Sequence, residues 1–386
     1  MATGFPTKAN WVSGDILTAA QMDDLAGTVN ALSNAAATSG SVLVSNVAGT
    51  SFAYQPLQAA GKNAVINGGM DIWQRGTSVA LAASSPYTSN YNADRWQVGT
   101  LAALEATTIS RQATADTTNL PNIQYAARVQ RNSGQTGVAA IYFGQSLETV
   151  NSIPYAGKQV TISYYARAGA NFSATANVFN STITTGTGTD QNLFPGYTGS
   201  VLNTSYDTLT STWQRFTHTI TLASTTSEIG VYFNYTPTGT AGANDYFEIT
   251  GVQLELGSTA TTFSRAGGSI GGELALCQRY YYRNTASSVY MTFGTGQAYS
   301  TTAAYINVQT PVPMRIAPST TIEASTLACT LSAGTFTPIT LVMNYPGTTN
   351  SLMTATAGGS VFTAGNGTIM TAANSTSAYL GLSAEL

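Results

Sequence analysis

Charged side chains are scarce in this sequence. Asp, Glu, Lys and Arg make up 8% of its 386 residues, against roughly a quarter of an ordinary globular domain. The formal net charge is −3 at pH 7. This balance argues against electrostatic binding to nucleic acid or to an anionic membrane, because both need clustered Lys and Arg. We therefore expect no nucleic-acid partner and no insertion into a membrane.

Histidine, cysteine and long apolar runs are also nearly absent. The chain has one histidine, His218, which cannot form the histidine pair of many metal sites. Any Ser-His-Asp triad would have to use this same residue as its base. Two cysteines, Cys277 and Cys329, are too few for a disulfide framework and lack metal-ligand spacing. No apolar run approaches the roughly 20 residues that span a bilayer, and the first residues lack a signal-peptide pattern. We expect no cofactor and no metal, in a protein made in a cytoplasm without a secretion signal.

The abundant residues favour β structure. Hydrophobic residues make up 43% of the chain, which is enough to form cores, and 37 glycines with 12 prolines supply turns. The polar residues are mostly Ser, Thr, Asn, Gln and Gly, which compete with helix hydrogen bonds, while Thr and Tyr suit pleated surfaces. A mainly β protein of two or three domains is therefore predicted.

Residues 1–60 are predicted to form a helical anchoring segment and a linker. A capping box at Thr18 to Gln21 precedes an apolar stripe at three- and four-residue spacing. The stripe consists of Met22, Leu25, Val29 and Leu32. It fits either one amphipathic helix on its own domain or a short coiled-coil seam between copies.

Residues 61–267 are predicted to form a jelly-roll β-sandwich. Apolar and polar residues alternate over 160–165, 216–222 and 229–235, as in half-buried strands, and no helices intervene. The alternation changes phase at Gly251, which predicts a β-bulge that re-aims the strand.

Residues 268–386 are predicted to form a second β domain after a short helix at 273–283. Only three charged side chains, Arg315, Glu323 and Glu385, occur beyond residue 283. A domain with so little charge is hard to keep soluble as a monomer. Burial against identical copies would resolve this, so we expect a homo-oligomer and, more specifically, a trimer.

The densest group of charged and aromatic residues lies within thirty positions early in this sandwich region. Its members are Asp71, Trp73, Arg75, Asp94, Arg95 and Trp96. We expect Asp71 to pair with Arg75, and Asp94 with Arg95, so that the charges neutralise one another where burial is costly. The group is therefore interpreted as a structural cluster.

Carboxylate pairs are the enzymatic alternative, as in glycoside hydrolysis. The candidates are Asp71, Asp94, Glu248 and Glu255. None of them has only apolar neighbours in the sequence, so we expect no raised carboxyl pKa among them. His218 shares a strand face with apolar residues, which indicates a semi-buried structural role. The glycine-rich segment 266–272 lacks a phosphate-loop lysine and is interpreted as a hinge between domains. No catalytic residue is assigned.

Tyrosines in loops are the candidates for recognition. Tyr and Trp present flat faces to sugar rings and amphipathic area to proteins. The candidates, taken from two loop clusters, are Tyr87, Tyr91, Tyr197 and Tyr206.

Several blocks, in this order, resemble structural proteins of bacteriophage tails and fibres. They are Asn67-Gly68-Gly69-Met70-Asp71-Ile72-Trp73-Gln74-Arg75-Gly76, Tyr91 to Trp96, Gly251 to Gly257, Glu273-Leu274 with Cys277 to Tyr281, Val312 to Arg315, and Ala384-Glu385-Leu386. The segment with Trp11, Gly14-Asp15 and Leu17 to Ala20 is also similar to the opening of many phage fibre proteins.

The resemblance implies a virion structural protein with a jelly roll like those of carbohydrate-binding modules. It also implies attachment to other virion proteins through the N-terminal region, and trimers. We expect a tail fibre or receptor-binding component, without enzymatic activity, that is assembled in the host cytoplasm and acts outside the cell on host surface glycan or protein. The alternatives are a head fibre or capsid decoration protein and, from another class, a capsular polysaccharide depolymerase.

Overall fold

The computed structural model describes residues 41–45, 52–56, 61–83, 89–99, 106–120, 122–319, 322–331, 334–336 and 339–386. The apolar stripe from Met22 to Leu32 and the candidate Tyr87 lie outside these ranges, so both stay predictions. The chain forms two compact units, Met1–Ala59 and Ala60–Leu386. The described strands of the first unit are β1 (Ser41–Ser45) and β2 (Phe52–Pro56), which pair antiparallel.

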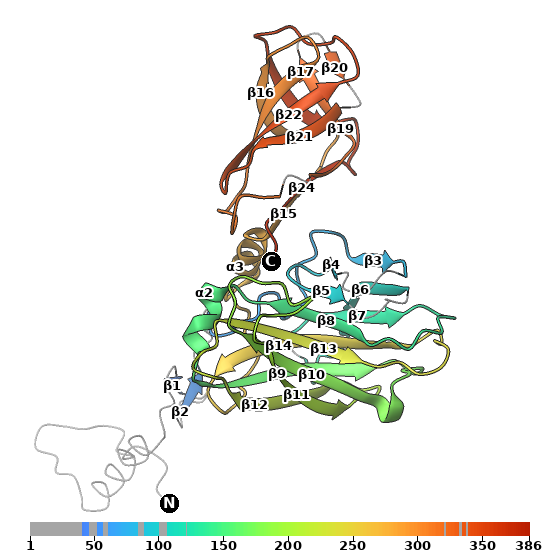
Figure 1. Ribbon diagram of the computed structural model, residues 1–386, viewed down its shortest axis with the longest axis vertical. Coiled ribbons are helices and arrows are strands. Elements are labelled where there is room, and N and C mark those ends of the chain that lie inside the picture. The colour runs from blue at the N-terminus through green and yellow to red at the C-terminus, as the bar shows by residue number, and fades with distance from the viewer. Residues whose placement is uncertain are drawn as a thin grey trace, which may run out of the picture. The chain divides into compact units, whose positions relative to one another are not determined.

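The second unit is mainly β, as the composition predicts, and contains two antiparallel six-stranded sheets (Figure 1). The first sheet consists of β4 (Ser89–Tyr91), β5 (Gln97–Gly99), β8 (Ile141–Ser146), β10 (Val178–Gly186), β11 (Val201–Thr208) and β13 (Glu228–Tyr235). The second sheet consists of β3 (Ser78–Leu81), β6 (Thr107–Ala113), β7 (Tyr125–Arg131), β9 (Gln159–Ala168), β12 (Gln214–Thr221) and β14 (Tyr246–Leu256).

The strand order is that of a jelly roll. The first sheet runs β11-β10-β13-β8-β5-β4 and the second β12-β9-β14-β7-β6-β3. Strands β7 to β14 therefore form two four-stranded halves, β11-β10-β13-β8 and β12-β9-β14-β7, in which the chain passes repeatedly from one sheet to the other. Eight strands arranged in this way make the two interlocked Greek keys of a jelly roll. The topology confirms the prediction from alternating residues.

Alternate side chains of the two sheets meet in one aromatic-rich core. Trp96 stacks on Phe143 with ring centroids 4.9 Å apart. Tyr164 of the second sheet meets Phe233 of the first edge to face at 4.8 Å. Such ring pairs stabilise a core beyond the area that they bury, so the aromatic residues hold the sheets together.

The predicted bulge in β14 is present. The register of β14 against β9 shifts between Thr250 and Gln253, and Gly251 has a φ of +60°. A side chain there would be strained, and a Cβ would lie 2.7 Å from Ile123 Cδ1. The bulge returns Val252 and Leu254 to the core side, as the phase change in the sequence indicates.

The described helices are short. They are α2 (Thr149–Ser152), η1 (Ile153–Tyr155), η2 (Thr175–Asn177) and α3 (Ile270–Gln278). The helix predicted at 273–283 begins earlier, because the Ser269 side chain accepts a hydrogen bond from Gly272 N and caps α3. It also ends earlier, since Tyr281 already belongs to a strand. Within the described residues no helix is long and apolar enough to cross a membrane.

The rest of the second unit forms two further antiparallel sheets. The three-stranded sheet β15-β24-β18 contains β15 (Tyr281–Thr285), β18 (Glu323–Ser325) and β24 (Tyr379–Ser383). The seven-stranded sheet contains β16 (Thr292–Ala298), β17 (Ala303–Gln309), β19 (Leu327–Leu331), β20 (Gly334–Phe336), β21 (Ile339–Tyr345), β22 (Asn350–Ala357) and β23 (Gly367–Ala372), in the order β20-β19-β23-β16-β17-β22-β21. These sheets share a separate core of mostly small and aliphatic residues, among them Ile306, Met353 and Leu380.

Candidate functional site

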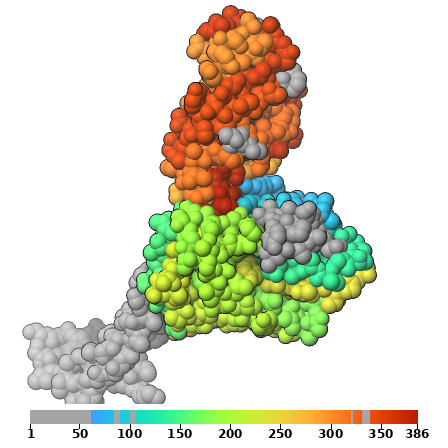
Figure 2. Space-filling view, in the orientation of Figure 1, coloured from blue at the N-terminus to red at the C-terminus, as the bar shows by residue number. Residues whose placement is uncertain are grey.

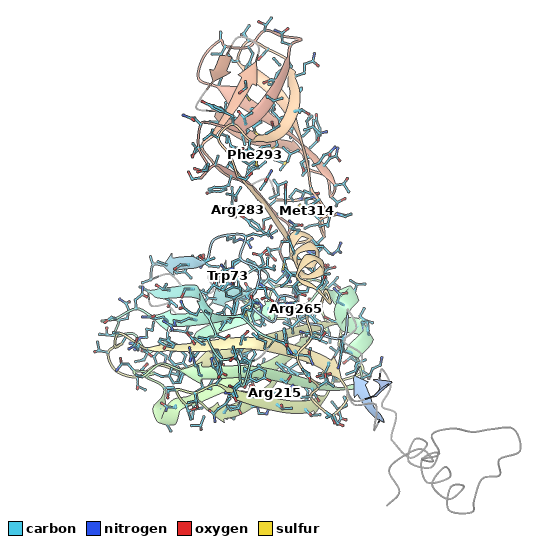
Figure 3. The ribbon with its side chains drawn as sticks, turned by 180° about the vertical axis from the view of Figure 1, so that it is seen from behind. Trp73, Arg215, Arg265, Arg283, Phe293 and Met314 are labelled. Carbon is cyan, nitrogen blue, oxygen red and sulfur yellow. The ribbon has the colours of Figure 1, made fainter. Side chains whose placement is uncertain are left out.

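The charged and aromatic group of the early sandwich region is a framework. Trp96 is fully buried and donates from Nε1 to Asn67 O at 3.1 Å, and Trp73 donates to Met70 O at 2.8 Å. Asn67, in left-handed backbone with a φ of 56°, donates to the carbonyls of Ile72 and Asp94. Both indoles thus hold backbone in place. Trp73 and Arg265 lie on the upper side of the sandwich in Figure 3, and Arg215 lies on the lower side.

The predicted pairing of these charges is wrong. Asp71 pairs with Arg265 at 2.8 Å, and both Arg75 and Arg95 pair with Glu385. Residues 71–75 are not helical, so the four-residue spacing does not bring Asp71 to Arg75. Arg95 has a φ of 71° in a tight turn, and its side chain leaves in a different direction from that of Asp94.

Asp94 lacks an ion-pair partner among the described residues. Its carboxylate accepts from Gln74 N at 2.8 Å and from Gln74 Nε2. Burial raises the pKa of Asp94 to about 6, although the bonds from Gln74 lower it. Burial also raises the pKa of Glu273, whose carboxylate accepts from Gly267 N and Asn67 N. Among the four candidate carboxylates, the expectation of an unraised pKa is therefore wrong for Asp94, because its enclosure comes from residues distant in sequence.

Glu273 also changes the interpretation of the glycine-rich segment. A Cβ on Gly267 would lie 2.2 Å from the carbonyl carbon of Gly272, so the two backbones are in close contact. With Gly267 N held by Glu273 at 2.7 Å, the segment is a closely packed turn. These contacts do not support the hinge that was inferred from the composition of the segment.

Glu385 is a residue whose partners the sequence did not indicate. Arg95 is 1% exposed and lies with its guanidinium 3.6 Å from the centre of the Tyr280 ring. Arg75 lies 3.5 Å from the centre of the Tyr281 ring. Segments far apart in the sequence, at 75, 95, 280–281 and 385, thus meet around one acidic side chain.

The other candidate carboxylates are enclosed by partners. Glu248 is fully buried between Arg128, at 2.6 Å, and Arg167, at 2.5 Å. Glu255 accepts from Thr261 N at 2.9 Å and lies 3.6 Å from Lys62 Nζ. No three His, Cys, Asp or Glu side chains gather at metal-binding distances in the described part of the chain.

His218 lies on the inner side of β12 and bonds through Nε2 to Asp207 Oδ2 at 2.8 Å. The same oxygen accepts from the Tyr164 hydroxyl. Asp207 belongs to β11 and the other two residues to the second sheet, so this group ties the sheets at their open edge. The sequence indicated the face of His218 but not its partner.

The loop tyrosines differ in exposure. Tyr197 is 7% exposed and donates to Ile229 O at 3.3 Å, and Tyr91 donates to Leu386 O at 3.0 Å. Tyr197 is therefore buried, and the Arg75 guanidinium lies 5.3 Å from the centre of the half-buried Tyr91 ring. Tyr206 is 71% exposed and lies in β11 rather than in a loop.

Tyr206 belongs to a row of side chains across the outer face of the first sheet. Strand register places Tyr206 opposite Asn180, Asn180 opposite Asn234, and Asn234 opposite Tyr142. We call Tyr206, Asn180, Asn234 and Tyr142 the tyrosine–amide row. These strands are paired with one another, so the sheet fixes the spacing of the row. The yellow-green part of the chain that includes β11 is exposed in Figure 2.

A neighbouring row of the same sheet also consists of uncharged residues. The next row contains Thr204, Thr182 and Tyr232, with a Thr182–Thr204 hydroxyl contact of 2.9 Å. Tyr142 packs edge to face on Tyr232 at 5.5 Å and on Phe194 at 5.9 Å. Asn180 Oδ1 is buried with no hydrogen-bond partner among the described residues. The surface thus offers the exposed ring of Tyr206 with the part-buried Asn180 beside it, whereas Asn234 is 7% and Thr182 1% exposed.

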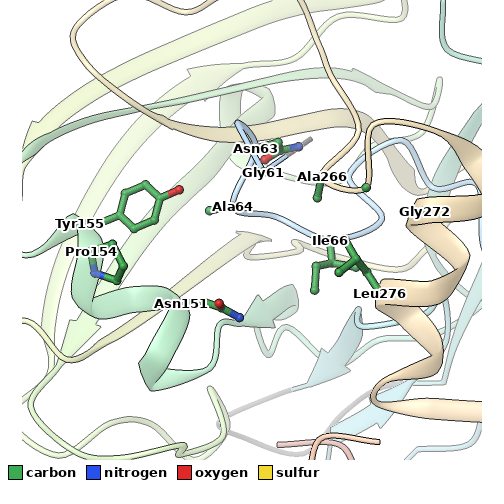
Figure 4. A pocket seen from close by; sticks show the side chains of 11 residues that line it. Gly61, Asn63, Ala64, Ile66, Asn151, Pro154, Tyr155, Ala266, Gly272 and Leu276 are labelled. Carbon is green, nitrogen blue, oxygen red and sulfur yellow. The ribbon is translucent and has the colours of Figure 1, made fainter. Parts of the chain in front are cut away.

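A cavity of about 620 Å³ lies elsewhere, between the segment at 61–66 and the helices α2 and α3 (Figure 4). Its lining is mostly apolar and includes Tyr155, Pro154, Ile66 and Leu276. The polar Asn63 side chain at this cavity is already engaged, since it donates to Val252 O and Ser264 O. The cavity therefore offers few groups that would orient a ligand.

No family model and no curated protein matches the sequence. Among solved structures, a CBM4 domain is similar at 22% identity and a TM-score of 0.24, over 34% of this chain and 71% of that one. The enzymatically active domain of tailspike protein 4 of Bacteriophage CBA120 is similar at 13% identity and a TM-score of 0.32, over 50% of this chain and 21% of that one. TmCBM61 in complex with β-1,4-galactotriose is similar at 11% identity and a TM-score of 0.27, over 50% and 99%.

Proposed function

We propose that this chain is a non-enzymatic adhesion protein of a virus particle, a tail-fibre or receptor-binding component, whose jelly roll binds a neutral surface glycan. The tyrosine–amide row is the observation that carries this proposal. Sugars present C–H faces that stack on aromatic rings and hydroxyls that exchange hydrogen bonds with carboxamides. The row supplies both kinds of group on one preformed sheet.

The absence of charge in both rows favours a neutral ligand. An acidic sugar would lose hydration at this surface without gaining an ion pair, which costs free energy. Tyr206 would provide the stacking face because it is 71% exposed. Asn180, next to Tyr206 in the row, would bind a hydroxyl, whereas Asn234 is buried and would support the row.

Adhesion by such a surface requires several copies. One exposed ring and one amide give a weak contact, but linked copies convert weak contacts into firm attachment. The proposal therefore includes a homo-oligomer, a trimer by the resemblance of the sequence blocks, that is joined to other virion proteins through the N-terminal region.

Glycan binding is tested with the full chain on an array of neutral and acidic oligosaccharides. We expect binding to neutral glycans, and Tyr206→Ala should weaken it about tenfold, equivalent to ~1.4 kcal/mol. The matched control is Tyr345→Ala, because Tyr345 is 69% exposed on the seven-stranded sheet. Equal binding by Tyr206→Ala and the unaltered chain would refute the role of the row.

Two further measurements separate the alternatives. Release of reducing sugar from host capsule would identify a depolymerase instead of an adhesion protein. The neighbour of residues 1–40 in an intact particle distinguishes a tail component from a head fibre or decoration protein, since contact with the capsid shell would favour the latter.

A further inference from the structure

The outer face of the second sheet carries a row of charged side chains. Strand register places Arg128 of β7 opposite Glu248 of β14, and Glu248 opposite Arg167 of β9. Their neighbours along the strands, among them Val129 and Phe247, belong to the sandwich core, so the three charged side chains point away from the core. We call Arg128, Glu248 and Arg167 the arginine row.

The carboxylate of the arginine row is covered by its two partners. Glu248 is fully buried, whereas the side chains of Arg128 and Arg167 are 24% and 27% exposed. Arg128 donates from Nε and Nη2 to Glu248 Oε1, and Arg167 donates from Nε to Glu248 Oε2. Nη1 of Arg128 and both Nη atoms of Arg167 have no hydrogen-bond partner among the described residues. One carboxylate thus holds two guanidiniums, and the row keeps one positive charge.

Aromatic rings orient both guanidiniums. Arg128 lies 3.9 Å from the centre of the Tyr246 ring, and Arg167 lies 4.8 Å from the centre of the Trp213 ring. Stacking of this kind fixes the plane of a guanidinium and leaves its N–H edge for an acceptor. Trp213 is 7% exposed, and its Nε1 has no hydrogen-bond partner within the described ranges. A buried donor of this kind costs free energy unless it is bonded, so an acceptor beside Arg167 is favoured.

The neighbourhood of the arginine row keeps a positive surplus. Arg215 of β12 lies on the same face, diagonal to Arg167 (Figure 3). Glu255, further along β14, lies 3.6 Å from Lys62 Nζ. Hydrogen bonds from its own loop, and to a smaller extent the charge of Arg167, lower the pKa of Asp116. In and around the row, positive side chains therefore outnumber carboxylates, although the chain as a whole has a formal net charge of −3.

We propose that the arginine row binds the carboxylate group of an acidic saccharide. A planar carboxylate can accept two parallel N–H bonds from the outward edge of one guanidinium. A saccharide fits better than a peptide, because β7, β14 and β9 are paired on both sides and offer no main-chain groups to an extended chain. The site lies on the other sheet from the tyrosine–amide row. The choice of a glycan as the source of the carboxylate rests on the proposed function.

The test measures binding of the full chain to an oligosaccharide that contains glucuronate and to its glucose-containing parent. We expect the wild type to bind the acidic form roughly tenfold more tightly at low salt, and to lose this preference at high salt, because exposed charges are screened. Arg167→Lys keeps a positive charge beside Glu248 but removes the guanidinium fork, so it should lose most of the preference. If Arg167→Lys does not fold, Arg128→Lys replaces it.

Arg111→Lys is the matched control. Arg111 of β6 is also stacked on a ring, 4.4 Å from the centre of Tyr125, but Ser110 rather than Arg111 lies opposite Arg128, so Arg111 belongs to the other face of the sheet. Arg111→Lys should therefore keep the preference for the acidic form.

Four outcomes would overturn the proposal. They are equal binding of the two saccharides by the wild type, an unchanged preference in Arg167→Lys, an equal loss in Arg111→Lys, and binding of oligoglutamate with the same dependence on Arg167. The last outcome would assign the site to peptides. Tyr206→Ala, measured in parallel, should keep the preference for the acidic form, so failure of the tyrosine–amide row and failure of the arginine row are distinguishable.

Discussion

At the scale of single residues, Asp94 shows how enclosure determines charge. Its carboxylate is fully buried and accepts hydrogen bonds only from Gln74 among the described residues, while the neighbouring Arg95 is turned toward Glu385. Burial raises the pKa of Asp94 from its ordinary 3.8 to about 6. A carboxylate in the unfolded chain loses its proton near the ordinary value, so the two states bind different numbers of protons between about pH 4 and pH 6.

This difference predicts a pH dependence of stability. The folded state holds the proton longer, so the contribution of Asp94 to the free energy of unfolding falls as the pH rises through this window. The total change is about 3 kcal/mol, since one pKa unit corresponds to ~1.4 kcal/mol. Asp94→Asn should remove this decrease when denaturant unfolding is compared at pH 4 and pH 7.

Asp116→Asn is the control for this prediction. The pKa of Asp116 is lowered by hydrogen bonds from Asn119 rather than raised by burial, so its removal should leave the decrease above pH 4 in place. An unchanged pH dependence in Asp94→Asn would show that Asp94 is ionised in the folded protein at all of these pH values.

At the scale of elements, β14 depends on its bulge. Gly251 has a positive φ, and a Cβ there would meet Ile123 at 2.7 Å and Tyr165 at 2.9 Å. Gly257, at the end of the same strand, also has a positive φ, but a Cβ there would meet nothing within 4 Å. The two glycines therefore share backbone strain and differ in steric room.

Alanine at each position separates the two effects. Both variants should lose roughly 1 kcal/mol or more of stability, because a non-glycine residue is strained in left-handed backbone. Gly251→Ala should lose a further ~1–3 kcal/mol, because the added methyl group overpacks the bulge. Denaturant unfolding measures both. Equal losses would mean that Ile123 and Tyr165 move aside without cost.

The sequence predicted elements of this kind because their signals are local. Alternation over 229–235 and the phase change at Gly251 are visible within a dozen residues, and both have the expected structural form. Tyr206 was a recognition candidate from the sequence alone, but its neighbours in the row, Asn180 and Asn234, come from other strands and needed the register. The pairings of Asp71, Arg75 and Arg95 were mispredicted because their partners lie 194 to 310 positions away. Charge neutralisation was expected correctly for Asp71, Arg75 and Arg95 but not for Asp94, and sequence proximity did not identify the partners.

At the scale of the whole second unit, Glu385 joins segments from both of its cores. It follows β24, whose Leu380 and Leu382 belong to the core beneath the seven-stranded sheet, and it pairs with Arg95, next to Trp96 in the sandwich core. Arg95 also donates to Ser146 O at 2.7 Å. The Arg95 guanidinium has little access to water, so its charge depends on this partner.

Glu385→Gln should therefore destabilise the second unit strongly. Removing one partner of a buried ion pair leaves an uncompensated charge, which costs about 3–5 kcal/mol. The control is Asp190→Asn, because Asp190 is 36% exposed and its 3.4 Å contact with Arg315 is worth no more than ~1 kcal/mol. Denaturant unfolding followed by tryptophan fluorescence suits the comparison, since Trp73 and Trp96 lie near the altered charges. Equal stability of the two variants would show that the Arg95 charge is solvated without Glu385, and that the cores are held together by the surrounding apolar and backbone contacts.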